Sequence, residues 1–436
     1  MEKGRMIAEG KTKRIFEAIG TEDEGCVGEC VVVENKSDIT AHDDPSLTRQ
    51  FAAKAHYATT TTCRIFELLN ACYIPTAYQR QLSETEFLMK RSEMVPLEVV
   101  ARRYAVGSYL KRHPELTPAD PKKPHRFHRL EVEFFLKTTG GKFGDVFSDL
   151  ADKGGKKIDD PLIVNAKEDE WRLIHSKKPD WSEESALSVA QIPHQVGPEA
   201  IEKMDKIVRQ LFLVLEKAWA NLGIDLIDIK VEFDSLMRVS DVVDNDSWRL
   251  WQNGEQLDKQ VFRDKGGAAL DEIEKKYGQV AELVNQLRLP KQAIVFWRGS
   301  DKDPLPDNFP AVPGITIGKV ALSGHKGTFE ALKRLERIFS EFPQGGVIIC
   351  SVGRSNGLGP ILAAHSVWPV IACPATLKEF PDDIWSSLRM PSGVPLLTAW
   401  PEANALDAAL GILAQTNPAA YMELQLKKES FDNFIA

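Results

Sequence analysis

The sequence has no apolar run long enough to cross a membrane, and its first residues, MEKGRMIAEGK, lack the apolar core of a signal peptide. Its cysteines do not follow the spacing of a disulfide framework. Cys26 and Cys30 form a C-x3-C pair, but no second pair of ligands accompanies them, which argues against a zinc site. We therefore expect reduced thiols and a cytoplasmic protein without membrane partners.

Basic residues are also fewer than acidic ones, and the formal net charge is −8. This balance argues against general nucleic-acid binding, although a local basic pocket for phosphate is compatible with it. No internal repeat is evident. With 436 residues, of which 43% are hydrophobic and 27% charged, the chain has the composition of a soluble enzyme and is too long for one ordinary core. Two or three domains are expected.

The most informative segment is LIDIKVEFD, in which Asp228, Lys230 and Glu232 alternate with aliphatic residues. A period of two places the three charges on one face of a strand. Carboxylates suit a magnesium ion, and a lysine offsets the charge of nucleotide phosphates. The alternative is a solvated strand face with ordinary cross-strand ion pairs.

A polar turn follows this strand in DVVDNDSWRLW. The turn returns the chain, so we expect Asp241 to lie opposite the charged face. Beyond it, Asp246 and Arg249 point toward a second, anionic ligand.

Mixed strands and helices are expected over residues 1–260. The predicted strands of this part are Thr12–Ala18, Gly28–Glu34, Glu86–Lys90 and Leu97–Tyr104, and the predicted helices are Thr48–Leu69 and Pro198–Leu222. Residues 114–160 are rich in Pro, Gly, Lys and His, which predicts long functional loops, with HRFHR at 125–129 a solvated basic loop rather than a metal site. Apolar residues at helical spacing predict a connecting helix over 262–290, ended by Pro290.

Residues 291–436 alternate apolar strands with helical segments, which is typical of a doubly wound parallel sheet. The predicted strands are Ala293–Trp297, Ile315–Leu322, Gly346–Val352 and Val370–Cys373. Ligands bind such sheets at the carboxyl ends of the strands, where the loops RGSDKD, SGHKG and GRSNGLGP follow. A glycine-rich turn between strand and helix cradles anions, and GRSNGLGP is such a turn.

Two motifs of the first part carry positive charge. GKTKRIFE places Lys11 and Lys13 on one strand face after a glycine, without the spacing of a Walker loop. EMVPLEVVARRYAVGSYLKR supplies Arg102, which can donate two hydrogen bonds to a carboxylate or phosphate, and Ser108 in a Gly-Ser turn.

Together GKTK, EMVPLEVV-x-R-x5-S, DIKVEF and D-x4-D-x2-RLW closely resemble the SAICAR synthetase family, over nearly all of residues 5–265. The resemblance implies an α+β fold similar to ATP-grasp enzymes and an ATP- and Mg²⁺-dependent ligation of L-aspartate to the carboxylate of CAIR. The implied ATP-binding residues are Lys11, Lys13, Lys230 and Glu232. The implied metal-site residues are Glu232, Asp241, Asp43 and Asp160. The implied CAIR-binding residues are Arg102, Ser108, Asp246, Arg249 and Arg263. Lys230 and Asp228 are also expected to be catalytic residues, Asp228 as a support for Lys230 or the metal site.

GS-x2-D, S-x-HKG, GRSNGLGP and DIWSSLRMPSG resemble the class II AIR carboxylase family over about residues 291–430. That family adds CO₂ to AIR without ATP, biotin or metal. The resemblance implies that His325 moves the ring proton, as an imidazole can near neutral pH. The implied AIR- and CO₂-binding residues are Ser300, Lys302, Asp303, Lys326, Arg354, Ser355, Asn356 and Gly357.

Three positions depart from the carboxylase pattern. Gly324 replaces the usual alanine and is expected to loosen its loop, Lys302 replaces a small hydroxyl residue, and His365 replaces a small or polar one.

We therefore expect a synthetase domain over 1–261, a connecting helix over 262–290 and a flavodoxin-like carboxylase domain over 291–436. The expected function is bifunctional: AIR and CO₂ give CAIR, which ATP and L-aspartate convert to SAICAR. The carboxylase resemblance also implies a homo-octamer. One alternative keeps the synthetase and makes the C-terminal domain an assembly scaffold. Another is a non-catalytic nucleotide-binding module, which the presence of both Glu232 and Asp241 disfavours.

Overall fold

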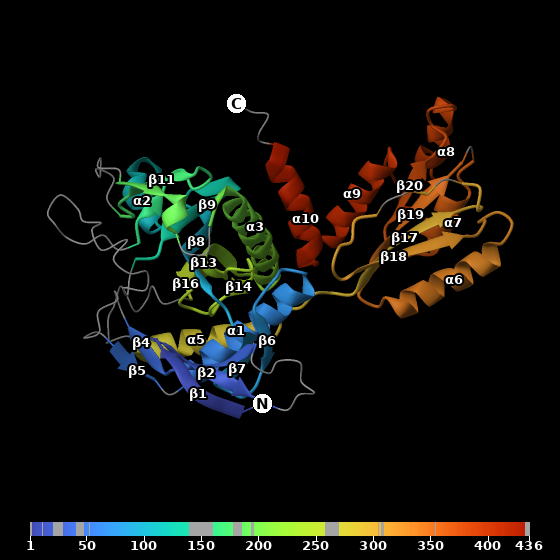
Figure 1. Cartoon of the computed structure of the whole chain (residues 1–436). Coiled ribbons are helices and arrows are strands. Elements are labelled where there is room, and N and C mark those ends of the chain that lie inside the picture. Colours follow the sequence, from blue (N-terminus) through green and yellow to red (C-terminus); the bar gives the residue numbers. More distant parts are fainter. Residues whose placement is uncertain are drawn as a thin grey trace. The chain divides into compact units, whose positions relative to one another are not determined.

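The computed structural model describes residues 2–10, 12–20, 29–40, 48–51, 53–138, 160–177, 185–192, 196–257, 270–303, 305–306, 309–353 and 355–431. The chain divides into two compact units, Met1–Leu287 and Arg288–Ala436, each with its own sheets and helices (Figure 1). Among the described helices, none combines the length and apolar character of a membrane span.

The first unit begins with an antiparallel five-stranded sheet in the order β1-β2-β3-β7-β6. These strands are β1 (Glu2–Glu9), β2 (Lys13–Ile19), β3 (Cys30–Asn35), β6 (Tyr78–Gln81) and β7 (Glu86–Lys90). Helix α1 (Lys54–Ala71) contacts β3, β6 and β7 with its buried face, and α5 (Leu270–Val284) packs against α1. A separate pair joins β4 (Asp38–Thr40) to β5 (Thr48–Gln50). Helix α5 therefore packs within the first unit.

A larger antiparallel sheet follows in the order β12-β11-β10-β9-β8-β13-β15-β16, with β14 paired to β13. Its strands are β8 (Met94–Tyr104), β9 (Arg126–Leu136), β10 (Leu162–Ile163), β11 (Glu170–Ile174), β12 (Ser185–Ser188), β13 (Asp225–Asp234), β14 (Val239–Ser240), β15 (Trp248–Gln252) and β16 (Glu255–Gln256). The amphipathic helix α3 (Pro198–Ala220) packs its apolar residues on β8, β9 and β13. This leaves the other face of the central strands for the charged side chains.

The second unit is a parallel sheet in the order β18-β17-β19-β20-β21. Its strands are β17 (Gln292–Arg298), β18 (Ile315–Ala321), β19 (Gly346–Val352), β20 (Val370–Pro374) and β21 (Leu396–Thr398). Its helices are α6 (Thr328–Glu341), α7 (Leu358–His365), α8 (Trp385–Leu388), α9 (Glu402–Leu413) and α10 (Pro418–Glu429). Numbered along the chain, the strand order is 2-1-3-4-5, which is that of flavodoxin-like sheets. The predicted fold class, α+β followed by a doubly wound parallel sheet, is confirmed.

Two predictions of local structure are wrong. The region predicted as loops over 114–160 contains strand β9, and HRFHR begins that strand. Phe127 and Leu130 of β9 are buried although their neighbours Arg126, His128 and Arg129 are exposed, so the strand has buried apolar positions despite its charge-rich composition. The helix predicted from Thr48 begins at Lys54, because Thr48–Gln50 pairs with β4.

The cysteines partly follow the expectation of reduced thiols. Cys63, Cys72, Cys350 and Cys373 are free and buried. Cys30 is disulfide-bonded, which corrects the expectation for that residue.

Candidate functional site

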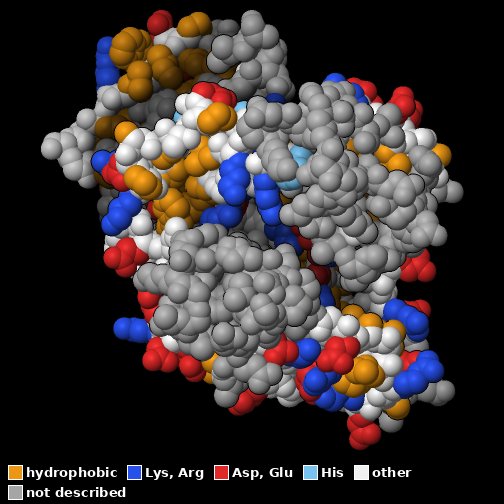
Figure 2. All heavy atoms as spheres, turned by 90° about the vertical axis from the view of Figure 1, so that its left-hand side faces the viewer, with side chains coloured by type: hydrophobic (Ala, Val, Ile, Leu, Met, Phe, Trp, Pro, Cys, Tyr) orange, Lys and Arg blue, Asp and Glu red, His pale blue; other side chains and the backbone are white. Residues whose placement is uncertain are grey.

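A cleft of about 1860 Å³ in the first unit is lined by residues of both of its large sheets. The β1–β2 hairpin and β3 contribute to one side, and β8 and β13 to the other. Figure 2 shows a hollow on this face, with Lys and Arg side chains gathered around it. A concave site with convergent charges is the usual form of a ligand pocket.

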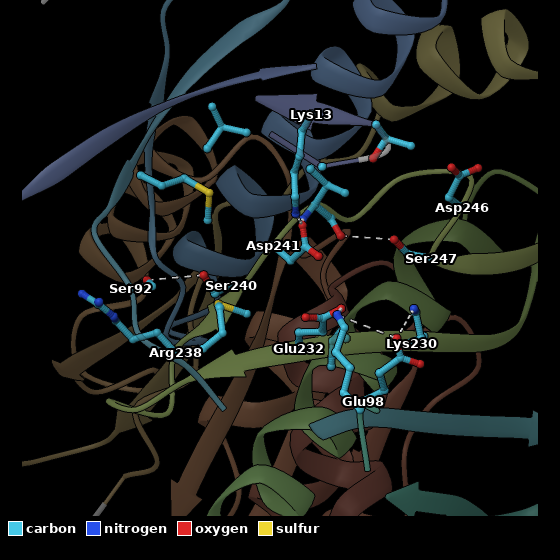
Figure 3. A pocket seen from close by; sticks show the side chains of 18 of the residues that line it. Lys13, Ser92, Glu98, Lys230, Glu232, Arg238, Ser240, Asp241, Asp246 and Ser247 are labelled. Carbon is cyan, nitrogen blue, oxygen red and sulfur yellow. Dashed lines mark hydrogen bonds and ion pairs between the residues drawn. The ribbon is translucent and has the colours of Figure 1, made fainter. Parts of the chain in front are cut away.

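Strand β13 contributes Lys230 and Glu232 to this cleft, as the period-two pattern predicts (Figure 3). Lys230 Nζ donates to Glu98 Oε1 at 2.7 Å, and Lys137 Nζ forms an ion pair with Glu232. Burial opposes ionisation of both β13 residues, but the surrounding opposite charges outweigh it. They raise the pKa of Lys230 and lower the pKa of Glu232, so both side chains are charged at neutral pH.

Asp241 lies where the polar turn was expected to bring it. Ser240 of β14 is paired with Glu232, and Asp241 follows with a φ of 67°, a left-handed conformation that turns the chain. Lys13 reaches it from the opposite wall and forms an ion pair (Figure 3). Lys13 is held by the hairpin turn in which the Gly10 amide donates to its carbonyl oxygen at 2.8 Å. Lys11 lies outside the described residues.

The residues proposed for magnesium offer two carboxylates in the cleft, Glu232 and Asp241. The described part of the chain contains no cluster of three or more His, Cys, Asp or Glu side chains able to hold a metal by itself. Asp160 also lines the cleft, but its Oδ1 accepts the Thr138 amide at 2.9 Å. Asp43 lies outside the described residues. Two carboxylates fit Mg²⁺, which takes one or two protein carboxylates and completes its shell with phosphates and water.

Five alternating charges continue the site beyond Lys230. Asp228 bridges Arg102 and Arg249, and Glu133 bridges Arg102 and Arg112. Arg102 is 4% exposed, whereas the Arg249 side chain is 21% exposed and lines the cleft. Asp228 thus contacts the arginines, and no ion pair joins it to Lys230.

Gly107 allows Arg249 to take its position. This glycine has a φ of 58°, and a Cβ at this position would lie 2.7 Å from Arg249 Nη2. The next residue, Ser108, places its hydroxyl 3.4 Å from Arg102 Nη2. The structure therefore brings Arg102, Ser108 and Arg249 together, while Arg263 lies outside the described residues.

Sequence reasoning did not identify Glu133, Lys137 or Glu98 as parts of the site. Glu133 and Lys137 lie on or just after β9, the strand that was predicted as loop. The alternation in RFHRLEVEFFLK was the signal that could have found them. Glu98 lies within the EMVPLEVV motif, and its role follows only from the pairing of β8 with β13, which sets it opposite Glu232.

In the second unit, the three predicted loops follow β17, β18 and β19 and therefore lie at the carboxyl ends of neighbouring parallel strands. The loop after β17 is closed by its own residues. Asp303 Oδ2 accepts the Ser300 amide at 2.8 Å, and Ser300 Oγ accepts the Lys302 amide at 3.2 Å. In the loop after β18, the Lys326 amide donates to Ser323 Oγ at 3.2 Å.

His325 lies directly against the glycine-rich loop that follows β19. A Cβ at Gly357 would lie 1.8 Å from His325 Nε2, so only glycine leaves room for the imidazole. Asn356 fixes this loop, because its Nδ2 donates to Ser387 Oγ at 2.9 Å and its Oδ1 accepts the Gly359 amide at 2.9 Å. Ser355 precedes it, and Arg354 lies outside the described residues.

The loop that contains Gly324, for which the sequence predicts a looser structure, packs closely against α7. A Cβ at Gly324 would lie 2.9 Å from the Cα of Leu358, so the glycine permits close packing against α7. The same loop is tied to its following helix by Thr328, whose hydroxyl donates to the Gly324 carbonyl at 2.5 Å. His365 is exposed at the end of α7.

Comparison with known proteins identifies the family of both units. A family model described as SAICAR synthetase matches residues 6–151 and 154–280, and one described as AIR carboxylase matches residues 313–433. The "Probable multifunctional protein ADE2" of Caenorhabditis elegans is 34% identical, over 98% of this chain and 95% of that protein. The chain belongs to the family of bifunctional AIR carboxylase/SAICAR synthetases. This membership confirms the predicted pair of purine-biosynthesis activities and their order along the chain.

Further relatives of this bifunctional family and of its separate parts are similar to the chain. The Homo sapiens "Bifunctional phosphoribosylaminoimidazole carboxylase/phosphoribosylaminoimidazole succinocarboxamide synthetase" is 30% identical, over 97% of this chain and 93% of that protein. A solved phosphoribosylaminoimidazole-succinocarboxamide synthase from Ehrlichia chaffeensis is 22% identical, with a TM-score of 0.48, and covers 65% of this chain and 100% of its own. Treponema denticola PurE is also 22% identical, with a TM-score of 0.28, and covers 33% of this chain and 94% of its own.

Proposed function

We propose that the cleft of the first unit is the synthetase active site, where ATP and Mg²⁺ activate the carboxylate of CAIR for attack by L-aspartate. The observation that carries this proposal is the convergence of Lys13, Lys230, Glu232 and Asp241 from separate elements on one cleft. Lysines beside carboxylates provide both charges that a magnesium–nucleotide complex needs.

Lys13 and Lys230 would hold the ATP phosphates, together with Lys11. The raised pKa of Lys230 supports this role, because its ammonium group is charged at the pH of catalysis. Glu232 and Asp241 would hold Mg²⁺, which when bound neutralises charge on the transferring phosphoryl group. Lys13 and Lys137, the present partners of these two carboxylates, would then be available to the phosphates.

The ribotide would lie at the arginine end of the cleft. Arg249 and Arg102 would bind its phosphate and carboxylate, with Ser108 and Asp246 supplying further polar contacts and Arg263 a further cation. Asp228 and Glu133 support this assignment, because bridging carboxylates fix the direction of each guanidinium.

The chemistry has two steps. An oxygen of the CAIR carboxylate attacks the γ-phosphorus of ATP, and ADP leaves with the electrons of the broken P–O bond. The amine of L-aspartate then attacks the acyl carbon, inorganic phosphate departs, and the amine proton passes to a base. Lysines that surround the acyl phosphate stabilise the negative charge that develops in both steps.

In the second unit, His325 would remove the ring proton as the carbon of AIR bonds to CO₂. Ser300, Lys302 and Lys326 would bind the ribotide phosphate, and Asp303 its ribose hydroxyls. Ser355, Asn356 and Gly357, with Arg354, would hold CO₂ or the new carboxylate. The contact of His325 with Gly357 supports this arrangement, because it sets the proton carrier beside the carboxylate cradle.

Paired substitutions test both assignments in the intact chain. E232Q should abolish most Mg²⁺-dependent ligation, by at least a hundredfold, and leave carboxylation unchanged; H325N should do the reverse. The two reactions are followed separately, by consumption of AIR and by formation of SAICAR. Ligation that depends on Mg²⁺ equally well in E232Q would refute the metal assignment. Carboxylation by the native chain at no more than the uncatalysed rate would make the second unit an assembly scaffold.

We further propose a cytoplasmic homo-octamer. Large apolar side chains on the surface of the second unit support self-association, since Val367 is 90% exposed, Phe329 64% and Leu388 53%. Light scattering on the native chain should give eight times the 48.7 kDa chain mass. A monomer mass at micromolar concentration would contradict the octamer.

A further inference from the structure

Asp246, which lines the synthetase cleft, is held by residues from two helices that lie outside its own sheet. The hydroxyl of Tyr277 on α5 donates to Asp246 Oδ1 at 2.7 Å. On the other side, Lys54 Nζ at the start of α1 lies 3.8 Å from Asp246 Oδ2. In Figure 3, Asp246 lies apart from the group formed by Glu98, Lys230 and Glu232.

Both partners of Asp246 are almost completely buried. Tyr277 is 1% exposed, and its ring packs edge-on against Phe51 with a centroid distance of 5.8 Å. Because packing fixes the ring, the position of its hydroxyl is fixed too. Lys54 is also 1% exposed, and a buried ammonium group requires a nearby carboxylate to offset its desolvation. The Asp246 side chain itself is 20% exposed, so it can reach a ligand in the cleft.

We propose that Tyr277 and Lys54 are positioning residues for the ribotide. Each of them contacts one carboxylate oxygen of Asp246. The Asp246 side chain is therefore already fixed when it accepts a hydrogen bond from an N–H or O–H group of the ribotide. An acceptor held in place binds more tightly because the entropy of fixing it is lost at folding and not at binding. This inference rests on the proposed ribotide-binding role of Asp246.

The arrangement gives α5 a function beyond connecting two domains. Its sequence, LDEIEKKYGQVAELV, has the apolar spacing of a helix packed on a core, and Tyr277 occupies one of these apolar positions. A phenylalanine would satisfy the packing equally well. The hydroxyl group is therefore the part of this residue that packing does not explain.

The test uses the full chain and the variants Y277F, D246N and Y277F/D246N. Y277F removes a hydrogen bond to a charged group and should raise the KM for CAIR about tenfold, with kcat changed less than twofold. Binding of CAIR, titrated by calorimetry without ATP or aspartate, should weaken by the same factor. The double variant should bind CAIR no more weakly than D246N, because Tyr277 acts only through Asp246.

Y57F is the matched control, since Tyr57 lies on α1 in the same helix pair and its ring packs beside Gly278. It should bind CAIR like the native chain, and carboxylation should be unchanged in every variant. K54M is the second probe and should also raise the KM for CAIR. If K54M lowers only the melting temperature and leaves this KM unchanged, Lys54 has a structural role and does not position Asp246.

Two results would overturn the inference, and they differ from each other. If D246N weakens CAIR binding but Y277F does not, the positioning role is wrong and the ribotide role of Asp246 stands. If D246N binds CAIR as the native chain does, the ribotide role of Asp246 fails and the positioning role fails with it.

Discussion

Single carboxylates join pairs of arginines at the ribotide end of the cleft. Glu133 accepts from Arg102 Nε at 2.7 Å and also pairs with Arg112, and its side chain is only 9% exposed. Removing a charge from such a buried network leaves its partners uncompensated, which costs about 3 kcal/mol in known cases. The arginines would then lose both their charge balance and their fixed direction.

We predict that E133Q raises the KM for CAIR about tenfold and lowers the melting temperature, while carboxylation is unchanged. Steady-state ligation kinetics and thermal unfolding measure the two effects. E131Q is the control, since Glu131 lies two residues earlier on β9 and is not a partner in the ion pairs of Asp228 and Glu133 described above. An E133Q variant with native KM would show that the arginines do not need this carboxylate.

The four free cysteines within the described residues should be inert in the folded protein. Burial raises the pKa of Cys63, Cys72 and Cys373 to about 12, and it also raises the pKa of Cys350. At pH 8 a thiol with such a pKa is ionised in roughly one molecule in ten thousand, and the thiolate is the reactive form.

We therefore predict that iodoacetamide at pH 8 leaves these four thiols unmodified in the native chain and modifies all of them in denaturant, as read by peptide mass spectrometry.

The same raised pKa values favour the protonated thiols in the folded state. Their contribution to stability is complete below the ordinary thiol pKa of 9.0 and decreases as the pH rises above it. Rapid native modification of Cys63 would contradict its burial.

Residue patterns predicted the centre of the site better than its surroundings. The alternation in β13 was enough to bring Lys230 and Glu232 to one face, and the turn length was enough to place Asp241. Lys54 and Tyr277 could not be found this way. They look like ordinary helix residues, and their contact with Asp246 depends on how α1 and α5 pack.

At the scale of elements, purely apolar strands are the easiest to predict. The limits of β19 agree with the prediction to the residue, because GVIICSV is buried on both faces and ends at glycines. Strand β9 was missed because its exposed charges make it resemble a loop in composition.

We predict that G357A lowers the rate of carboxylation at least a hundredfold, because the added methyl group would displace the imidazole ring of His325 that packs against Gly357. Ligation should be unaffected. G353A in the same loop is the control, since a Cβ there has no neighbour within 4 Å, and it should retain carboxylation. Assays of both reactions on each variant measure this, and an active G357A would mean that His325 does not work from this position.

At the scale of the whole molecule, the two units have separate cores. A buried cluster that includes Val295, Ile348 and Leu362 lies wholly in the second unit, whereas Ala18, Val32 and Leu88 cluster in the first. Domains with separate cores often unfold in separate transitions.

We predict two transitions in scanning calorimetry, of which Mg²⁺ and ATP raise only the one belonging to the first unit. A ligand at a hundred times its Kd stabilises its domain by about 2.7 kcal/mol. In E232Q, most of the shift produced by Mg²⁺ and ATP should be lost, and the transition that loses its shift is the one that belongs to the first unit. A shift of both transitions together would show that the units unfold as one.

The contact between His325 and Gly357 has a consequence for how such sequences can diverge. Because the two positions share one small volume, a relative that acquires a side chain at the position of Gly357 must already have a small residue at the position of His325. In an alignment of relatives, the positions of His325 and Gly357 should therefore change together. The histidine should be replaced by a small residue before the glycine gains a side chain. A glycine at the position of Gly357 then indicates that a relative still has room for the histidine, even where the rest of the loop differs in sequence.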